Sequence, residues 1–128
     1  MLQSDMNQSN ILVVDDKKEN LLVLRQILKK QDYNVQTVNN GQAALEAAQA
    51  TPPDLVLLDI MMPGMKGYEV CRHLKASEKT RDIPVIFITV LSETEDKLKG
   101  FEAGGVDYIT KLFQPKEVVA RVKTHLTI

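Results

Sequence analysis

Acidic, hydroxyl and amine side chains follow four separate apolar segments of this sequence, and together they could support phosphoryl chemistry. Asp15 and Asp16 follow the run ILVV, Asp59 follows DLVLL, and Thr89 and Lys111 end two later β-type segments. Clustered carboxylates without histidine or thiolate partners suit Mg²⁺, while a lysine and a threonine hydroxyl can balance phosphoryl oxygens. The set predicts a magnesium-assisted phosphoryl site in which one carboxylate is the nucleophile.

Two aliphatic runs must position the carboxylates. Ile11–Val14 and Leu55–Leu58 show no period-2 alternation. Unbroken runs of this kind are typical of central strands in a parallel sheet, where both faces are buried. The ligand crevice of an open parallel sheet lies at the carboxyl ends of its strands. We therefore expect the acids, Thr89 and Lys111 to converge at one edge.

The remaining chain alternates predicted strands and helices. Besides the two central runs, strands are predicted at 34–38 (an edge strand), 85–88 and 106–110. Helices are predicted at 18–31, 42–50, 68–76, between a Ser92–Glu95 capping box and Gly104, and at 115–126. Short connections between alternating elements predict an α/β fold: a single doubly wound five-stranded parallel sheet of order 2-1-3-4-5, flavodoxin-like. The fourth helix has a thin apolar face and should be the least firmly packed.

Composition limits the class of protein. The chain has 128 residues, of which 44% are hydrophobic and 26% charged, which suits one globular domain. A net charge of −1 gives no electrostatic case for a nucleic-acid partner. No apolar run approaches about 20 residues, so no membrane span is expected. We expect a flexible tail at 1–9 and a domain at 10–128. The single cysteine, Cys71, is interpreted as a core residue of a helix. One cysteine cannot form an internal disulfide, which suits a reducing compartment, and we expect the cytoplasm.

From Asn10 to about Leu126 the chain resembles the receiver domain of bacterial two-component response regulators. The resemblance rests on VVDD at 13–16, LLDIMMPGMKG at 57–67, Thr89, and DYITK at 107–111. It implies that Asp59 accepts a phosphoryl group from a phosphohistidine on a sensor histidine kinase or phosphotransfer protein. The chain would then be a signalling domain that catalyses its own phosphorylation and dephosphorylation, not a turnover enzyme.

The resemblance also implies a metal site. Asp16 and Asp59 would bind Mg²⁺ directly, together with the backbone carbonyl of Met61. Asp15 would hold a metal-bound water.

A conformational switch is implied as well. Thr89 would hydrogen-bond the phosphoryl group, Lys111 would pair with it, and Tyr108 occupies the position of an aromatic that turns inward on activation. We expect this movement to shift the fourth helix. The surface of the fourth helix, fifth strand and fifth helix would then engage a downstream effector protein or domain, or a second copy in a homodimer.

Two residues depart from the family pattern. Leu112 stands where relatives usually have a proline after a cis bond. A cis bond before a non-proline residue costs roughly 2.5–4 kcal/mol, so we expect a trans bond that could shift Lys111. Val90 is bulkier than the residue common in relatives and could crowd the phosphoryl pocket.

The residues two positions beyond Asp59 and Thr89 tune phosphoryl lifetime in the family. Here they are Met61 and Leu91. Neither side chain can position an attacking water. We therefore predict slow self-dephosphorylation.

Other interpretations stay open at this stage. The chain could be a degenerate receiver that acts as a phosphorylation-independent interaction or dimerisation module. A Mg²⁺-dependent phosphatase with an aspartyl nucleophile is the third candidate, although such enzymes commonly carry a second acid where Met61 stands. Locally, Asp16 could cap the following helix in a capping box with Glu19, and Tyr108 could simply pack. His73 and His125 lack companion ligands and are expected at helix surfaces or ends.

Overall fold

The computed structural model describes residues 8–90, 94–111 and 113–126. The strands are β1 (Asn10–Val14), β2 (Asn34–Val38), β3 (Leu55–Asp59), β4 (Val85–Thr89) and β5 (Asp107–Thr110). The helices are α2 (Lys18–Lys29), α3 (Gly41–Ala50), α4 (Gly67–Ala76), α5 (Thr94–Ala103) and α6 (Pro115–Leu126). The tail expected at 1–9 lies mostly outside the described residues, as do Leu91, Ser92 and Leu112.

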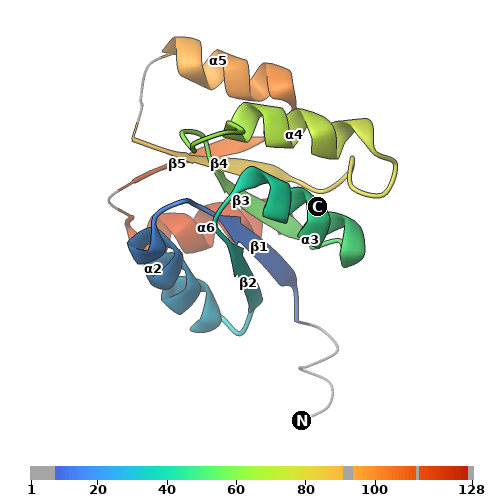
Figure 1. The fold of residues 1–128 in the computed structure, drawn as a ribbon. Coiled ribbons are helices and arrows are strands. Elements are labelled where there is room, and N and C mark those ends of the chain that lie inside the picture. The colour runs from blue at the N-terminus through green and yellow to red at the C-terminus, as the bar shows by residue number, and fades with distance from the viewer. Residues whose placement is uncertain (1–7, 91–93, 112, 127–128) are drawn as a thin grey trace.

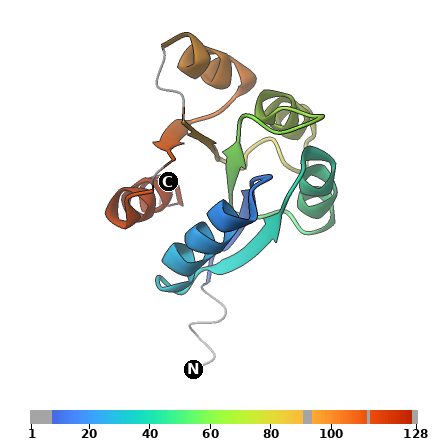
Figure 2. The ribbon, with the colours of Figure 1, turned by 60° about the vertical axis from the view of Figure 1, so that its left-hand side comes forward.

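The strands form one parallel sheet in the order β2-β1-β3-β4-β5 (Figure 1). Helices α2 and α6 cover one face, and α3, α4 and α5 cover the other (Figure 2). This arrangement confirms the predicted doubly wound, flavodoxin-like α/β fold. No helix in the described part of the chain is both long enough and apolar enough to span a bilayer.

Burial explains why the three central strands are so apolar. Every residue of β3 and β4 is buried, as is β1 after Asn10, whereas β2 at the sheet edge has no fully buried residue. The register pairs Val14 with Leu58 and Thr89 with Thr110. The carboxyl ends of these strands therefore lie level at one edge of the sheet, which is the edge that carries the acids.

The end of α2 differs from the sequence prediction by two residues, and the other described strand and helix boundaries differ from it by at most one residue. Helix α2 ends at Lys29, two residues early, because Asp32 adopts a left-handed conformation (φ 66°) in the turn that leads to β2. Strand β5 begins at Asp107, one residue late. None of these differences moves a candidate site residue out of place.

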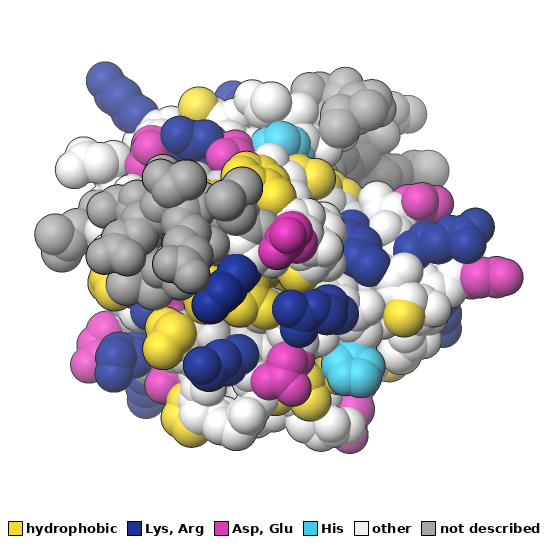
Figure 3. Space-filling model, turned by 90° about the horizontal axis from the view of Figure 1, so that it is seen from above, with side chains coloured by type: hydrophobic (Ala, Val, Ile, Leu, Met, Phe, Trp, Pro, Cys, Tyr) yellow, Lys and Arg dark blue, Asp and Glu magenta, His cyan; other side chains and the backbone are white. Residues whose placement is uncertain are grey.

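The side chains described for α5, at 99–103, are mostly exposed, and the prediction of light packing also depends on Leu98, whose side chain is not among those described. Among its described side chains, Ala103 joins the core whereas Phe101 is half exposed. Seen from above, basic and acidic side chains are interspersed with small hydrophobic areas at this end of the molecule (Figure 3). Cys71 of α4 is buried and free, and its thiol donates to the carbonyl of Ala103, so the prediction of a core cysteine is confirmed.

Candidate functional site

Three carboxylates and one ammonium group meet at the carboxyl edge of the sheet. Asp15, Asp16 and Asp59 each offer an oxygen within 4.8 Å of the others. The Lys111 Nζ lies 3.0 Å from Asp59 Oδ1 and 3.7 Å from Asp15 Oδ2. The structure thus brings together side chains that are up to 96 positions apart in the sequence, from Asp15 to Lys111.

Asp59 is the last residue of β3 and is almost fully buried. The chain leaves the strand through a bond from the Ile60 amide to the Ile88 carbonyl (3.2 Å), and the Gly67 amide then donates to the Ile60 carbonyl (2.9 Å). This second bond brings the start of α4 directly against the backbone of Asp59. The loop between them, 60–66, is therefore closed at its base.

Gly67 has no room for a side chain. An added Cβ would overlap the carbonyl oxygen of Asp59 and lie 2.9 Å from the Ile60 Cα, and backbone atoms cannot rotate away. We predict that Gly67→Ala lowers the free energy of unfolding by about 3 kcal/mol. Gly64→Ala is the matched control: it is strained by a φ of 82° but has nothing within 4 Å, so about 1 kcal/mol is expected. Equal losses in urea denaturation would contradict this account.

Asp15 is held by several donors. Its carboxylate accepts from the Lys17 amide (2.9 Å) and the Asn20 side chain (3.1 Å), and it is fully buried. Asp16 is partly exposed and does not cap α2, since the N-cap position is Lys17 and makes no side-chain cap bond. The capping interpretation of Asp16 is therefore wrong.

The acidic cluster fits a divalent cation. Asp16 Oδ1 and both carboxylate oxygens of Asp59 are buried without a well-aligned hydrogen bond, although Lys111 is close to one of them. Buried carboxylate oxygens that lack hydrogen bonds are costly, and the single Lys111 ammonium does not balance three carboxylates, whereas a divalent cation would. An all-oxygen donor set of this kind suits Mg²⁺, which usually keeps several waters. Met61 follows in the loop after β3 with its side chain half exposed.

Burial also changes the protonation of the acceptor candidate. Desolvation raises the pKa of Asp59 to about 6, the Lys111 ammonium opposes this rise, and the Asp15 carboxylate adds to it. A carboxyl group with this pKa is partly protonated in mildly acidic solution. A cation bound at this cluster would therefore compete with a proton for the oxygens of Asp59.

Thr89 and Lys111 are positioned by the pairing of β4 with β5. Thr89 ends β4 and is buried, and its carbonyl accepts from the Lys111 amide (2.8 Å). The peptide bond before Leu112 lies outside the described residues, but the Lys111 ammonium does reach Asp59. Val90 is 67% exposed, so its side chain lies largely in solvent and the crowding hypothesis gains no support.

Tyr108 is buried on the face of the sheet that α3, α4 and α5 cover. Its ring centroid lies 5.6 Å from that of Phe87 and 5.4 Å from that of Phe101. The ring is therefore already packed inward, beneath α5, in this structure.

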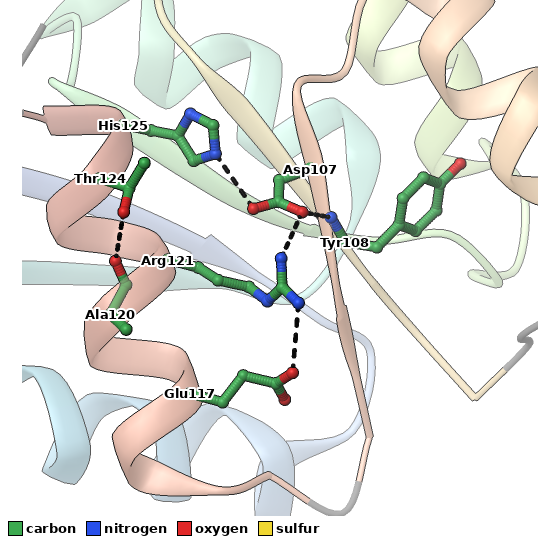
Figure 4. Close-up of polar contacts among 7 residues, drawn as sticks. All are labelled: Asp107, Tyr108, Glu117, Ala120, Arg121, Thr124 and His125. Atoms are coloured by element: carbon green, nitrogen blue, oxygen red, sulfur yellow. Dashed lines mark hydrogen bonds and ion pairs between the residues drawn. The ribbon is translucent and has the colours of Figure 1, made fainter.

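A polar cluster between β5 and α6 was missed by the sequence analysis (Figure 4). Asp107 accepts from the Tyr108 amide (2.8 Å) and from Arg121 (2.7 Å), and it lies 3.0 Å from His125 Nε2. Burial alone would raise the pKa of Asp107, but these partners together hold it below its usual range. The available signal was the spacing of Glu117, Arg121 and His125, which places them on one helical face.

Comparison with known proteins agrees with the fold and identifies the family. The sequence model of the family described as "Response regulator receiver domain" matches residues 11–123. The chain is 44% identical over 126 residues to a probable cyclic di-GMP phosphodiesterase of Vibrio cholerae, covering 98% of this chain and 28% of that protein. It is 40% identical to the DNA-binding response regulator MtrA of Mycolicibacterium smegmatis, covering 95% of this chain and 52% of MtrA.

A solved structure gives the same result. The chemotaxis protein CheY4 of Vibrio cholerae superposes with a TM-score of 0.90 at 25% identity, over 93% of this chain and 99% of that one. A doubly wound sheet with an acidic cluster at its carboxyl edge defines the class, and the chain belongs to the receiver-domain family of two-component response regulators. It spans about half or less of the length of these curated relatives.

Proposed function

We propose that this receiver domain accepts a phosphoryl group on Asp59 from a phosphohistidine donor, in a Mg²⁺-dependent reaction that its own residues catalyse. One observation carries the proposal: the buried Asp59 carboxylate lies within 3.0 Å of the Lys111 ammonium and beside two further carboxylates. Three carboxylates this close together repel one another unless a cation lies between them. The arrangement is therefore better suited to binding a metal and a phosphoryl group than to stabilising the fold.

The reaction follows from these positions. An Asp59 carboxylate oxygen attacks phosphorus, the P–O bond forms, and the P–N bond of the donor breaks, leaving its electron pair on the imidazole nitrogen. Lys111 stabilises the phosphoryl oxygens, and Thr89 is assigned a hydrogen bond to one of them. Asp16, Asp59 and the Met61 carbonyl are assigned to Mg²⁺, with Asp15 acting through water. Bound Mg²⁺ would neutralise charge on the transferring group.

The partners follow from the same chemistry. The donor is a sensor histidine kinase or phosphotransfer protein in the cytoplasm, and the recipient of the signal is an effector protein or domain. Tyr108 is assigned to the switch, and α5, β5 and α6 to the surface that contacts the effector or a second copy of the chain. MtrA is a DNA-binding regulator, so the absence of a nucleic-acid partner stays a prediction for this chain.

Acetyl phosphate tests the proposal without knowledge of the kinase. With Mg²⁺ present, a stable adduct on the protein is expected, and it should be absent when EDTA removes the metal. Rapid multiple turnover would favour a phosphatase. The absence of an adduct with and without Mg²⁺ would favour a phosphorylation-independent interaction module, but the convergence of the three carboxylates and the Lys111 ammonium argues against it.

Mg²⁺ affinity should depend on pH. Because the pKa of Asp59 is raised to about 6, a proton displaces the metal below that value. We expect the dissociation constant to be about tenfold larger near pH 5 than near pH 7. Titration by isothermal calorimetry or NMR measures this, and a pH-independent affinity would show that Asp59 is not a ligand.

Dephosphorylation should be slow. Met61, two residues beyond Asp59, is half exposed, and its side chain offers no group that could orient an attacking water. We predict that Met61→Asn, which adds an amide, accelerates loss of the phosphoryl group by about tenfold or more. A half-life of seconds in the unmodified protein, followed by mass spectrometry after removal of donor, would reject the prediction.

A further inference from the structure

Gly100 lies inside α5, where glycine is unfavourable. It is buried, and its φ is not among the positive values of the described residues, so a left-handed conformation does not explain its presence. Glycine in a helix interior lowers the folding equilibrium constant by about fivefold relative to alanine. Another feature of the structure must therefore require the missing side chain.

The space above Gly100 is occupied by Tyr108. A Cβ at position 100 would overlap the Tyr108 hydroxyl oxygen and lie 2.8 Å from Tyr108 Cζ. Phe87 Cδ2 would be 2.9 Å away. We call this space the Gly100 notch. The phenol tip reaches the helix backbone only because the notch exists.

Tyr108 also borders a second space. A polar cavity of about 410 Å³ is lined by Tyr108 together with Thr89, Phe101, Asp107, Thr110, Glu117 and Arg121. Figure 4 shows the ring directed away from Asp107 and the α6 cluster. The ring therefore lies between the notch, which it fills, and a cavity into which a rotated ring could move.

We propose that Gly100 is a positioning residue for Tyr108: the notch is the inward seat of the ring and couples the ring's position to α5. A role of this contact in the switch depends on the proposed function, whereas the contact between Gly100 and Tyr108 does not. Filling the notch should expel the ring towards the cavity. The usual helix-stabilising effect of a glycine-to-alanine change should therefore reverse.

A double-mutant cycle tests this on the full chain. Gly100→Ala is expected to lower the folding equilibrium constant by about tenfold in the Tyr108 background. Tyr108→Leu removes both close phenol atoms, so the loss should shrink by at least about fivefold in that background. Lys99→Ala, an exposed change in the same helix, is the matched control and should show no coupling to position 108.

Fluorine NMR of 3-fluorotyrosine protein reports the ring directly, with Tyr33→Phe and Tyr68→Phe assigning the signals. Gly100→Ala should move the Tyr108 signal towards that of an exposed tyrosine. Coupling below about twofold would overturn the proposal whatever the spectrum shows. Energetic coupling between positions 100 and 108 without a change in the Tyr108 fluorine signal would mean that the two residues only pack together, and it would overturn the positioning role. Neither measurement involves phosphorylation, so a failure here is distinct from a failure of the proposed function.

Discussion

Asp59→Asn is expected to abolish phosphoryl acceptance completely while making the metal-free protein more stable. The first effect follows because an amide oxygen is not a nucleophile comparable with a carboxylate. The second follows because a neutral group replaces a buried charge that lacks well-aligned hydrogen bonds. A change that only damaged the fold would lower both quantities, so the opposite directions identify the role of Asp59.

The stability effect has a defined sign and pH range. The folded pKa of Asp59, about 6, lies above its ordinary value of 3.8, so the folded protein binds this proton more tightly than the unfolded chain. Ionised Asp59 therefore costs stability increasingly as pH rises from about 4 through 6. Near neutral pH, Asp59→Asn should raise the free energy of unfolding by about 1–3 kcal/mol.

Urea denaturation at several pH values measures this gain, which should vanish below about pH 4. Asp32→Asn is the matched control, because Asp32 is exposed and asparagine tolerates its left-handed backbone. It should leave both phosphorylation and stability nearly unchanged. A lower free energy of unfolding for Asp59→Asn near neutral pH would contradict the account in which the buried Asp59 charge destabilises the metal-free protein.

Lys111→Ala is expected to reduce the rate of phosphorylation by acetyl phosphate by at least about a hundredfold. The ammonium lies 3.0 Å from Asp59 and is the one basic group paired with the cluster among the described residues. Removing it leaves developing charge on the phosphoryl group without its fixed counter-charge. Mg²⁺ should bind more tightly to the variant, because a repelling cation has been removed from an acidic site.

The opposite movement of rate and metal affinity is the diagnostic result. Lys116→Ala removes the same charge from an exposed position on α6 and should change neither. A Lys111→Ala protein that binds Mg²⁺ more weakly would indicate that the lysine supports the shape of the site. Unchanged phosphorylation would remove Lys111 from the proposed mechanism.

Much of the fold was predictable because burial leaves a direct mark on the sequence. The unbroken aliphatic runs at β1 and β3 predicted central strands, and the more mixed β2 predicted an edge strand. Strand order followed from the chirality and shortness of the connections. The end of α2 was less predictable, since it depends on Asp32 adopting a left-handed conformation that the local residues permit but do not require.

The candidate site was predictable where strand ends align, and less so where helices contribute. Parallel strands bring their carboxyl ends to one edge, so Asp59 and Lys111 could be placed together from the sequence. Asn20, which donates to Asp15, lies in the first turn of α2 and gave no comparable signal. The requirement for Gly67 depends on how closely α4 approaches β3, which only coordinates reveal.

The most direct test is to locate the phosphoryl group on the unaltered protein. After reaction with acetyl phosphate and Mg²⁺, borohydride reduction converts an aspartyl phosphate to homoserine, which tandem mass spectrometry can place in the sequence. The account predicts that the modification falls on Asp59 and depends on Mg²⁺. Modification of another residue, or an equal yield without metal, would contradict it.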